Sequence, residues 1–396
     1  MVIFSMSDPR KVALDILYRI SSSGAYGNIG LLSADLSGAD RGLCTELIKG
    51  VTERKRTLDN IISRYVNKTP DAKITELLRM GVYQIIFLSR VPDHAVCDES
   101  VKTAKQINRG SAGFVNAVLR SVCREKESII NSLSSLPEPV YYSVSDSIFK
   151  LIKEQYPENY RDILKAFYEK RPVSVRANTL KDTPYVDGVN ENTDMGDIEK
   201  GLFFVQGLSS QQAVKTLNAR AGMTVVDLCA CPGGKSFGAA IDMQNKGRII
   251  SSDLHKNKLS LITKGAEKMG ITIIETVERD ARITDESLIG FADRVICDVP
   301  CSGLGVICTK PEIRYKNAAD FEGLYPTQQK ILENALLYLK KGGRAVYSTC
   351  TINKRENGDI TEKVLKNKEG YRLVSEQTIL PGNGYDGFYI AVIERD

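Results

Sequence analysis

Histidine is scarce in this chain. Only His94 and His255 occur among 396 residues, and the nine cysteines follow no zinc-binding spacing. Structural zinc sites need four cysteine or histidine ligands at short, regular intervals, so we expect no metal. A disulfide framework is not expected either, because the chain is long and shows no secretion signal.

Long apolar runs are also absent. No stretch approaches the roughly 18–20 apolar residues that a membrane-spanning helix needs. The opening residues, MVIFSMSDPRK, lack the charged leader and the small-residue cleavage site of a signal peptide. The hydrophobic fraction of 42% and the charged fraction of 26% are typical of a globular protein. We predict a soluble, cytoplasmic protein without a membrane partner.

The positive charge is unevenly distributed. The net charge is +5, and residues 1–130 alone hold 19 lysines and arginines against 14 acidic residues. The whole basic excess therefore lies in the first third of the chain. Such a bias favours an acidic partner such as nucleic acid, although an ordinary solvated surface is as compatible with the charge alone.

The first third also has the apolar spacing of helices. One stripe begins at Ala13, and similar stripes recur as far as Val122. We predict an all-helical bundle over residues 1–130. The aperiodic stretch SLSSLPEP follows as a linker, and residues 131–205 are predicted to hold this linker and a small subdomain.

Beyond residue 205 the pattern changes to short apolar, β-branched runs that alternate with helix-compatible segments. This alternation predicts a doubly wound, mainly parallel sheet. The fold class is therefore α + α/β, with a Rossmann-like domain over residues 206–396 and a terminal hairpin. The predicted strands lie at residues 223–230, 247–254, 271–281, 292–300, 342–350, 372–377 and 387–395.

The first predicted strand leads into a loop with two adjacent glycines, in VVDLCACPGGKS at 225–236. Glycine lets the backbone turn tightly and approach a ligand closely. The loop has neither the G-x-G-x-x-G pattern nor the Walker pattern, so a pyrophosphate site is not indicated.

Acidic residues end the following strands, at Asp253, Asp280 and Asp298. A carboxylate after the second strand suits ribose hydroxyls, and Asp280 is placed to meet an adenine amino group. A single aspartate in such a place often only caps the next helix. Three of them around one glycine loop favour a nucleoside-bearing cofactor.

Two cysteines each follow an apolar run: Cys301 in DVPCSGLG and Cys350 in YSTCT. Ligands bind at the carboxyl ends of parallel strands. In the strand order 3-2-1-4-5, strands one, four and five are neighbours, which would bring Lys235, Asp298 and both thiols to one crevice. The common alternative for a free cysteine is a buried, apolar thiol.

These motifs resemble those of the RNA cytosine-5 methyltransferases that use S-adenosylmethionine, and most closely the bacterial 16S rRNA enzymes of the RsmB/Sun type. The resemblance covers nearly the whole chain. It implies a NusB-like helical RNA-binding domain, a small RNA-contacting segment and a class I methyltransferase domain. It is carried by CACPGGK (229–235), Asp253, Asp280, DVPCSG (298–303) and YSTCT (347–351).

The resemblance also implies that Cys350 is the nucleophile and that Cys301 assists release of the methylated product. The residues alone leave this order open, because DNA cytosine-5 methyltransferases attack from a Pro-Cys motif. Asp298 is expected to hold the base, with Lys235 supporting its carboxylate or lowering the pKa of a thiol. The expected S-adenosylmethionine residues are Cys229, Ala230, Cys231, Pro232, Gly233, Gly234, Lys235, Asp253, Asp280 and Asp298.

The segment SVRANTL resembles the part of the family beside the RNA path, so Arg176 and Asn178 are candidate RNA contacts. The chain also departs from the family pattern. Cys231 stands where alanine is usual, and Cys308-Thr309 stands where basic residues are common. We expect the first change to be harmless and the second to weaken a phosphate contact.

The predicted function is methylation of carbon 5 of a specific cytosine in 16S rRNA through a covalent cysteine–cytosine adduct. The expected partner is this RNA, free or in a partly assembled small subunit, with no obligate protein partner. Two alternatives stay open: the same reaction on transfer RNA, and a catalytically silent NusB-like RNA-binding assembly factor. Because all expected catalytic positions are filled, the silent factor is disfavoured.

Overall fold

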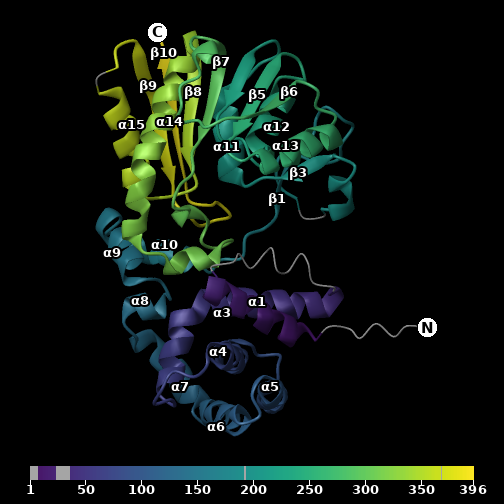
Figure 1. The fold of residues 1–396 in the computed structure, drawn as a ribbon, viewed down its shortest axis with the longest axis vertical. Coiled ribbons are helices and arrows are strands. Elements are labelled where there is room, and N and C mark those ends of the chain that lie inside the picture. Colours follow the sequence, from purple (N-terminus) through teal and green to yellow (C-terminus); the bar gives the residue numbers. More distant parts are fainter. Residues whose placement is uncertain (1–7, 24–35, 191–192, 367) are drawn as a thin grey trace, which may run out of the picture. The chain divides into compact units, whose positions relative to one another are not determined.

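The computed structural model describes residues 8–23, 36–190, 193–366 and 368–396. The chain forms two compact units (Figure 1). The first runs to Lys150 and also takes in Lys310–Lys316, and the second holds the remaining residues. The first unit thus extends past residue 130, and the segment expected at 131–205 is divided between the two.

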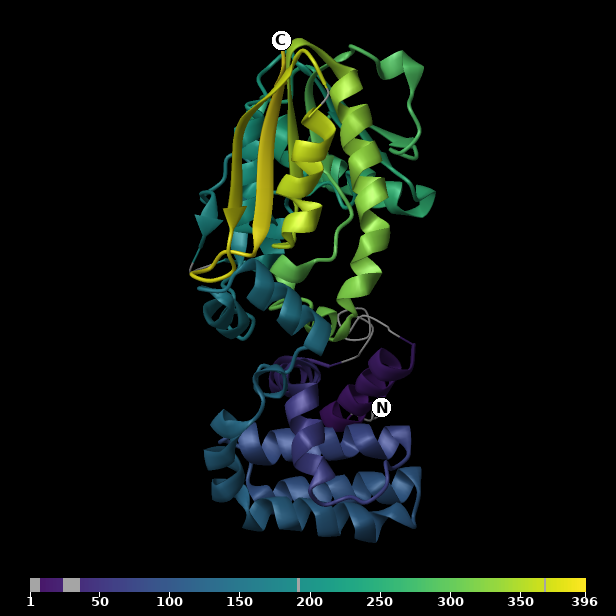
Figure 2. The same ribbon diagram turned by 90° about the vertical axis from the view of Figure 1, so that its left-hand side faces the viewer.

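The first unit is helical, as predicted. Apolar residues at helical spacing form one continuous core, in which Leu47, Leu58, Leu77 and Leu119 are fully buried. Figure 2 shows its long helices stacked side by side. The helices are α1 (Pro9–Ser23), α3 (Gly38–Ser63), α4 (Ala72–Phe87), α5 (Asp93–Ile107), α6 (Ser111–Arg124), α7 (Lys126–Ser132) and α8 (Glu138–Tyr141), and α9 (Asp146–Gln155) begins in this unit.

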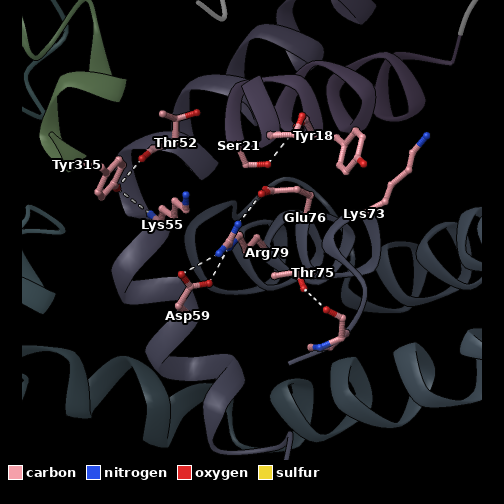
Figure 3. A network of polar contacts seen from close by, with 12 residues as sticks. Tyr18, Ser21, Thr52, Lys55, Asp59, Lys73, Thr75, Glu76, Arg79 and Tyr315 are labelled. Carbon is pink, nitrogen blue, oxygen red and sulfur yellow. Dashed lines mark hydrogen bonds and ion pairs between the residues drawn. The ribbon is translucent and has the colours of Figure 1, made fainter. Parts of the chain in front are cut away.

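A partly buried ion pair joins two of these helices (Figure 3). Arg79 on α4 donates from Nε and Nη2 to the two carboxylate oxygens of Asp59 on α3, at 2.6 and 2.9 Å. Its Nη1 contacts Glu76, whose side chain is only 4% exposed. The bidentate geometry fixes α3 against α4 more firmly than a single contact would.

Residues 310–316 belong to this unit although they follow the Cys301 motif in sequence. The hydroxyl of Tyr315 donates to the carbonyl oxygen of Thr52 at 2.6 Å and accepts from the backbone N–H of Lys55 at 3.1 Å (Figure 3). The Arg314 carbonyl accepts from the N–H of Ser145 at 2.8 Å. The segment, with the short helix η5 (Pro311–Tyr315), is therefore part of the helical fold.

The second unit contains a seven-stranded sheet in the order β6-β5-β4-β7-β8-β10-β9. The first five strands are parallel and follow the predicted 3-2-1-4-5 order, and β10 pairs antiparallel with β8 and β9. Figure 2 shows β9 and β10 as the long C-terminal hairpin. The strands are β4 (Thr224–Asp227), β5 (Arg248–Asp253), β6 (Ile274–Glu278), β7 (Ala292–Asp298), β8 (Leu339–Thr349), β9 (Tyr371–Ile379) and β10 (Phe388–Arg395).

Both faces of this sheet are covered by helices. Successive residues of a strand point to opposite faces, so Val225 packs with one helical layer while Val226 packs with the other. This explains why the parallel strands read as continuous apolar runs. The layers comprise α11 (Leu208–Leu217), α12 (Gly234–Asp242) and α13 (Lys256–Met269) on one face, and α14 (Tyr325–Tyr338) and α15 (Gly358–Leu365) on the other.

The fold class predicted from the sequence is confirmed. The second unit begins with the rest of α9 and with α10 (Tyr160–Ala166), followed by a small sheet of β1 (Ser174–Ala177), β2 (Gly188–Val189) and β3 (Phe203–Val205). Among the described residues, no helix has the length and hydropathy of a membrane span. The same residues contain no cluster of histidine, cysteine, aspartate or glutamate that would hold a metal ion.

We predict that Arg79→Met destabilises the helical unit by about 3–5 kcal/mol, because it leaves buried Glu76 without its counter-charge. Hydrogen exchange of the α3 and α4 amides in the full chain measures this loss. The matched control is Lys102→Met, which breaks the exposed Lys102–Glu99 pair on α5 and should leave stability nearly unchanged, because solvent screens such a pair. Equal effects of both changes would contradict the prediction.

Candidate active site

The glycine loop connects β4 to α12 at the carboxyl edge of the sheet. Gly233 has a φ of +112°, and a Cβ there would lie 2.4 Å from the Phe237 ring. Only glycine therefore fits this position without displacing the ring. The peptide bond between Cys231 and Pro232 is cis.

Two neighbouring cavities of about 340 and 230 Å³ lie at this edge. Cys229, Cys231 and Asp298 line both of them. The larger is also lined by Asp253 and Asp280, and nine of the ten residues expected to bind the cofactor line one cavity or the other. The tenth, Gly233, shapes the loop between them. The predicted residues are thus brought together around one continuous site.

The carboxylates in the larger cavity differ in their partners. Asp253 accepts from the N–H of His255 at 3.0 Å and ends β5. Asp280 is held by Arg282, with Nη2 to Oδ2 at 2.6 Å, and these hydrogen bonds keep the pKa of Asp280 below its ordinary value. An adenine amino group would therefore have to share Asp280 with this guanidinium.

Asp227, the last residue of β4, is a site residue that the sequence analysis missed. It is 1% exposed and lines the smaller cavity. Burial raises the pKa of Asp227 to about 7, against a smaller lowering by the hydrogen bond from Ser236 Oγ, which lies 2.7 Å from Oδ2. The available signal was an acidic residue that directly ends the first apolar run.

Unsatisfied acceptors mark what the smaller cavity would bind. Asp227 Oδ1 and Gln206 Oε1 are buried and have no hydrogen-bond partner among the described residues, and both residues line this cavity. Buried polar atoms are normally satisfied. Two unsatisfied acceptor oxygens on residues that line one cavity therefore suit a ligand with amino-group donors.

Lys235 and Asp298 form the charged centre of the site. Lys235 Nζ lies 2.5 Å from Asp298 Oδ2, and Ser348 Oγ donates to Asp298 Oδ1 at 2.7 Å. Lys235 is 13% exposed and Asp298 30%, so the carboxylate still faces the crevice while its charge is compensated. Ser348 was not predicted, because nothing in the sequence marks a serine inside a strand as a site residue.

The two cysteines meet at the ends of neighbouring strands. Cys301 Sγ lies 3.3 Å from Cys350 Sγ. The hydrogen bond with Cys350, and then burial, raise the pKa of Cys301 well above its ordinary value. Cys301 is therefore a protonated thiol at neutral pH, beside a second sulfur.

A close approach of two glycines holds the loop beyond Cys301. The N–H of Gly305 donates to the carbonyl of Cys350 at 3.0 Å, and the N–H of Gly387 donates to the carbonyl of Gly305 at 2.8 Å. A Cβ on Gly305 would lie 1.8 Å from the Gly387 carbonyl oxygen. The glycine at 305 is therefore required for the two cysteine loops to lie together.

The two candidate RNA contacts are not at the crevice surface. Arg176 is 3% exposed and forms ion pairs with Asp187 and Asp242. Asn178 is fully buried and donates to the carbonyls of Gly201 and Met269, at 2.8 and 2.9 Å. Contact with RNA would require both side chains to leave these partners, so the structure gives them a role in holding the small sheet.

The two unusual cysteines differ in burial: Cys231 is partly exposed and Cys308 is buried. Cys231 Sγ lies 3.8 Å from the carbonyl of Lys258, beside the larger cavity. Cys308 is 2% exposed and accepts from Arg171 Nε at 3.2 Å. A guanidinium therefore lies beside this position, although residue 308 itself carries no charge.

Comparison with known proteins identifies the family. A model described as 16S rRNA methyltransferase RsmB/F matches residues 214–394, and a NusB family model matches residues 7–124. A probable ribosomal RNA small subunit methyltransferase B of Bacillus subtilis is 34% identical over 389 residues, which cover 89% of this chain and 86% of that protein. Ribosomal RNA small subunit methyltransferase B of Vibrio cholerae is 27% identical, covering 98% and 97%.

A solved structure shows the same fold. The crystal structure of PH0851 has a TM-score of 0.77 and 22% identity, and the match covers 98% of this chain and 99% of that one. This structural match shows the fold alone, whereas the sequence matches also show the family. The chain belongs to the RsmB/F family of 16S rRNA methyltransferases, with a NusB domain, and is an S-adenosylmethionine-dependent enzyme.

The buried carboxyl of Asp227 predicts a pH-dependent stability. Its pKa in the fold, about 7, exceeds its usual value of 3.8, so stability falls as pH rises through this range. We expect Asp227→Asn, which stays neutral, to be more stable than the parent chain above pH 7. Three pKa units correspond to on the order of 4 kcal/mol. Denaturant midpoints at pH 4 and pH 8 measure the difference.

Asp293 provides a control, because its pKa is shifted in the opposite direction to that of Asp227. Hydrogen bonds from the Thr224 N–H and from Lys340 outweigh burial and lower the pKa of Asp293. Its contribution to stability is present above the unfolded-state pKa and is lost as pH falls. Asp293→Asn should therefore be less stable than the parent chain at pH 8. A stability gain for Asp227→Asn that is equal at both pH values would contradict the prediction.

Proposed function

We propose that this enzyme methylates carbon 5 of a specific cytosine in 16S rRNA, with Cys350 as a covalent nucleophile. The observation that carries the proposal is the pair of sulfurs at 3.3 Å, in the loops that follow the neighbouring strands β7 and β8, together with the Lys235–Asp298 ion pair at the end of β7. The substrate class rests on the family and on the names of the relatives, which are small subunit rRNA methyltransferases.

Carbon 5 of cytosine is a weak nucleophile, and two thiols offer a way to activate it. Addition of the Cys350 thiolate to carbon 6 makes carbon 5 nucleophilic, which is covalent catalysis. After carbon 5 has taken the methyl group, it loses its proton to a base. The bond between Cys350 and carbon 6 then breaks, and its electron pair returns to the sulfur. Cys301 assists this release.

Asp298 is proposed to hold the base: one carboxyl oxygen accepts from the exocyclic amine, and the other contacts ring nitrogen 3 through a proton that the carboxyl group must carry there. Its Oδ1 and Oδ2 are already aligned by Ser348 and Lys235, so the group is oriented before the base arrives. The Lys235 ammonium compensates the charge of this carboxylate, and it supports a thiolate in the same crevice.

S-adenosylmethionine supplies the methyl group when bound, and the cavities fit it. The orphaned acceptors of Asp227 and Gln206 suit the amino group of its methionine part. Asp253 lies in the larger cavity at the strand end that suits ribose hydroxyls. We therefore assign the methionine part to the smaller cavity and the adenosine to the larger.

The proposal includes the organisation of the chain. Residues 1–130 bind or position RNA, residues 131–205 form a linker with a small RNA-contacting segment, and residues 206–396 carry the catalytic domain. The partner is 16S rRNA, free or in a partly assembled small subunit. The same chemistry on transfer RNA is the alternative substrate. A catalytically silent factor is disfavoured, because the thiol pair and the ion pair are both in place.

Asp253→Ala should weaken cofactor binding by about 10–150-fold, the equivalent of about 1.5–3 kcal/mol from charge-assisted hydrogen bonds to ribose. Calorimetric titration with S-adenosylmethionine measures the change. The control is Glu267→Ala, an exposed residue of α13 that lines neither cavity. Unchanged affinity in the Asp253 variant would remove this residue from the cofactor site.

The two cysteine variants should fail differently. Cys350→Ala should neither methylate RNA nor form a covalent complex, because the attacking sulfur is gone. Cys301→Ala should transfer the methyl group and then stall, leaving protein linked to RNA. Denaturing electrophoresis with 16S rRNA and S-adenosylmethionine detects the complex as a slow band.

The opposite result would indicate the mechanism of DNA cytosine-5 methyltransferases, in which the cysteine of the Pro-Cys motif attacks. A slow band with Cys350→Ala but not with Cys301→Ala would make Cys301 the nucleophile. Methylation that persists in both variants without any band would show that neither sulfur is covalent. The same assay with transfer RNA in place of 16S rRNA tests the alternative substrate.

A further inference from the structure

Glu356 is a buried carboxylate that contacts the loops carrying the two cysteines. It ends the short helix η7 (Lys354–Glu356), six residues after Cys350, and is fully buried. Its Oε2 accepts from the N–H of Ser302 at 2.8 Å and from Gln328 Nε2 at 3.0 Å. Its Oε1 accepts from Asn353 Nδ2 at 2.9 Å. The mechanism above does not use this group.

The partners of Glu356 belong to both cysteine loops. Ser302 directly follows Cys301, and Asn353 lies in the loop that follows Cys350. A further hydrogen bond joins these loops, between Ser302 Oγ and Thr351 Oγ1 at 2.8 Å. One side chain thus bridges the two segments that carry the sulfurs.

The same carboxylate is anchored to the covering helix. Gln328 on α14 donates to the Pro300 carbonyl at 2.9 Å as well as to Glu356. Tyr347 lies inside β8, and its hydroxyl donates to the backbone carbonyl of Glu356 at 2.6 Å. The bridge between the loops is therefore fixed to the sheet on one side and to a helix on the other.

The contacts explain why this position suits a carboxylate. All three partners of the side chain are N–H donors, and a carboxylate accepts at both oxygens, whereas an amide would turn an NH₂ group toward one of the donors. Burying a charge is costly unless it is well hydrogen-bonded. An apolar side chain of similar volume often stabilises a fold as well as a buried charge does. Stability alone therefore does not explain a carboxylate at position 356, which suggests a functional role.

We propose that Glu356 is a positioning residue that holds the Cys301 loop against the Cys350 loop, so that Cys301 reaches the adduct on Cys350. This inference rests on the proposed function. Release of the methylated base needs both sulfurs at the same carbon–sulfur bond. A displacement of about 1 Å at such a site is enough to lower a rate about 100-fold. Loss of Glu356 should therefore mainly slow release.

The test is Glu356→Gln in the full chain, with 16S rRNA and S-adenosylmethionine. We expect kcat to fall by about 10–100-fold, with the calorimetric affinity for S-adenosylmethionine unchanged. We also expect the covalent protein–RNA complex to accumulate, as for Cys301→Ala. A variant that is merely less stable would not accumulate this complex, because accumulation requires attack and methyl transfer to proceed normally.

Two further variants keep the test decisive. Gln328→Met removes the helix anchor while preserving side-chain length, and should accumulate the complex to a smaller extent. Thr361→Val is the matched control. Thr361 is also buried and bonds Gly358 O and Tyr389 Oη, away from the cysteine loops. It should retain the parental kcat and form no complex.

The outcomes separate this inference from the function it rests on. Parental kcat in Glu356→Gln, or an equal fall in kcat and cofactor affinity without the complex, would overturn the positioning role while the function stands. Methylation that persists in Cys350→Ala would overturn both. Accumulation in Glu356→Gln and Gln328→Met but not in Thr361→Val would support the positioning role.

Discussion

The position of β7 between β4 and β8 is the constraint on which the site depends. In the parallel register, Asp227 of β4 lies beside Ile296 of β7, and Asp298 lies beside Ser348 of β8. Parallel strands end at one edge of a sheet, so the residues that follow these pairs emerge together. Cys301 and Cys350 lie three and two residues beyond the Asp298–Ser348 pair. Backbone pairing thus starts the two cysteine loops side by side, and side-chain contacts such as those of Glu356 then hold the loops in which the sulfurs lie 3.3 Å apart.

The carboxyl groups around this edge differ because their donors differ. Asp227 is buried with one side-chain donor, Ser236, and its pKa rises to about 7. Asp298 has a lysine and a serine, one on each oxygen, and its side chain stays 30% exposed. Glu356 accepts three N–H groups and is fully enclosed. One edge therefore combines three acids with different roles: Asp227 with a raised pKa, Asp298 oriented by Lys235 and Ser348, and Glu356 joining the two cysteine loops.

Sequence patterns predicted what depends on strand ends and missed what depends on strand interiors and loops. The strand order and the meeting of Lys235 with Asp298 follow from apolar runs with polar ends, a signal that is local in sequence. Ser348 and Glu356 carry no such signal, because a serine within a strand and a glutamate in a loop are ordinary surface residues in most proteins. Arg176 is a candidate RNA contact because SVRANTL resembles the family segment beside the RNA path, and its burial against Asp187 and Asp242 depends on residues outside that segment. The inclusion of residues 310–316 in the helical unit likewise depends on long-range contacts such as that of Tyr315 with Thr52.

Cys308 departs from the family pattern, and the neighbouring residues accommodate this cysteine. A basic residue was expected there, yet the position is 2% exposed, and a charge at such a depth needs a partner. Arg171 brings a guanidinium to the same place from a distant segment, donating Nε to Cys308 at 3.2 Å, with Asp386 Oδ1 at 4.0 Å from that nitrogen. Its two terminal nitrogens have no hydrogen-bond partner among the described residues. A guanidinium paired with Asp386 and Glu169 therefore lies beside position 308, while the Cys308 sulfur accepts from Arg171 and donates to Asp386 Oδ1 at 3.6 Å.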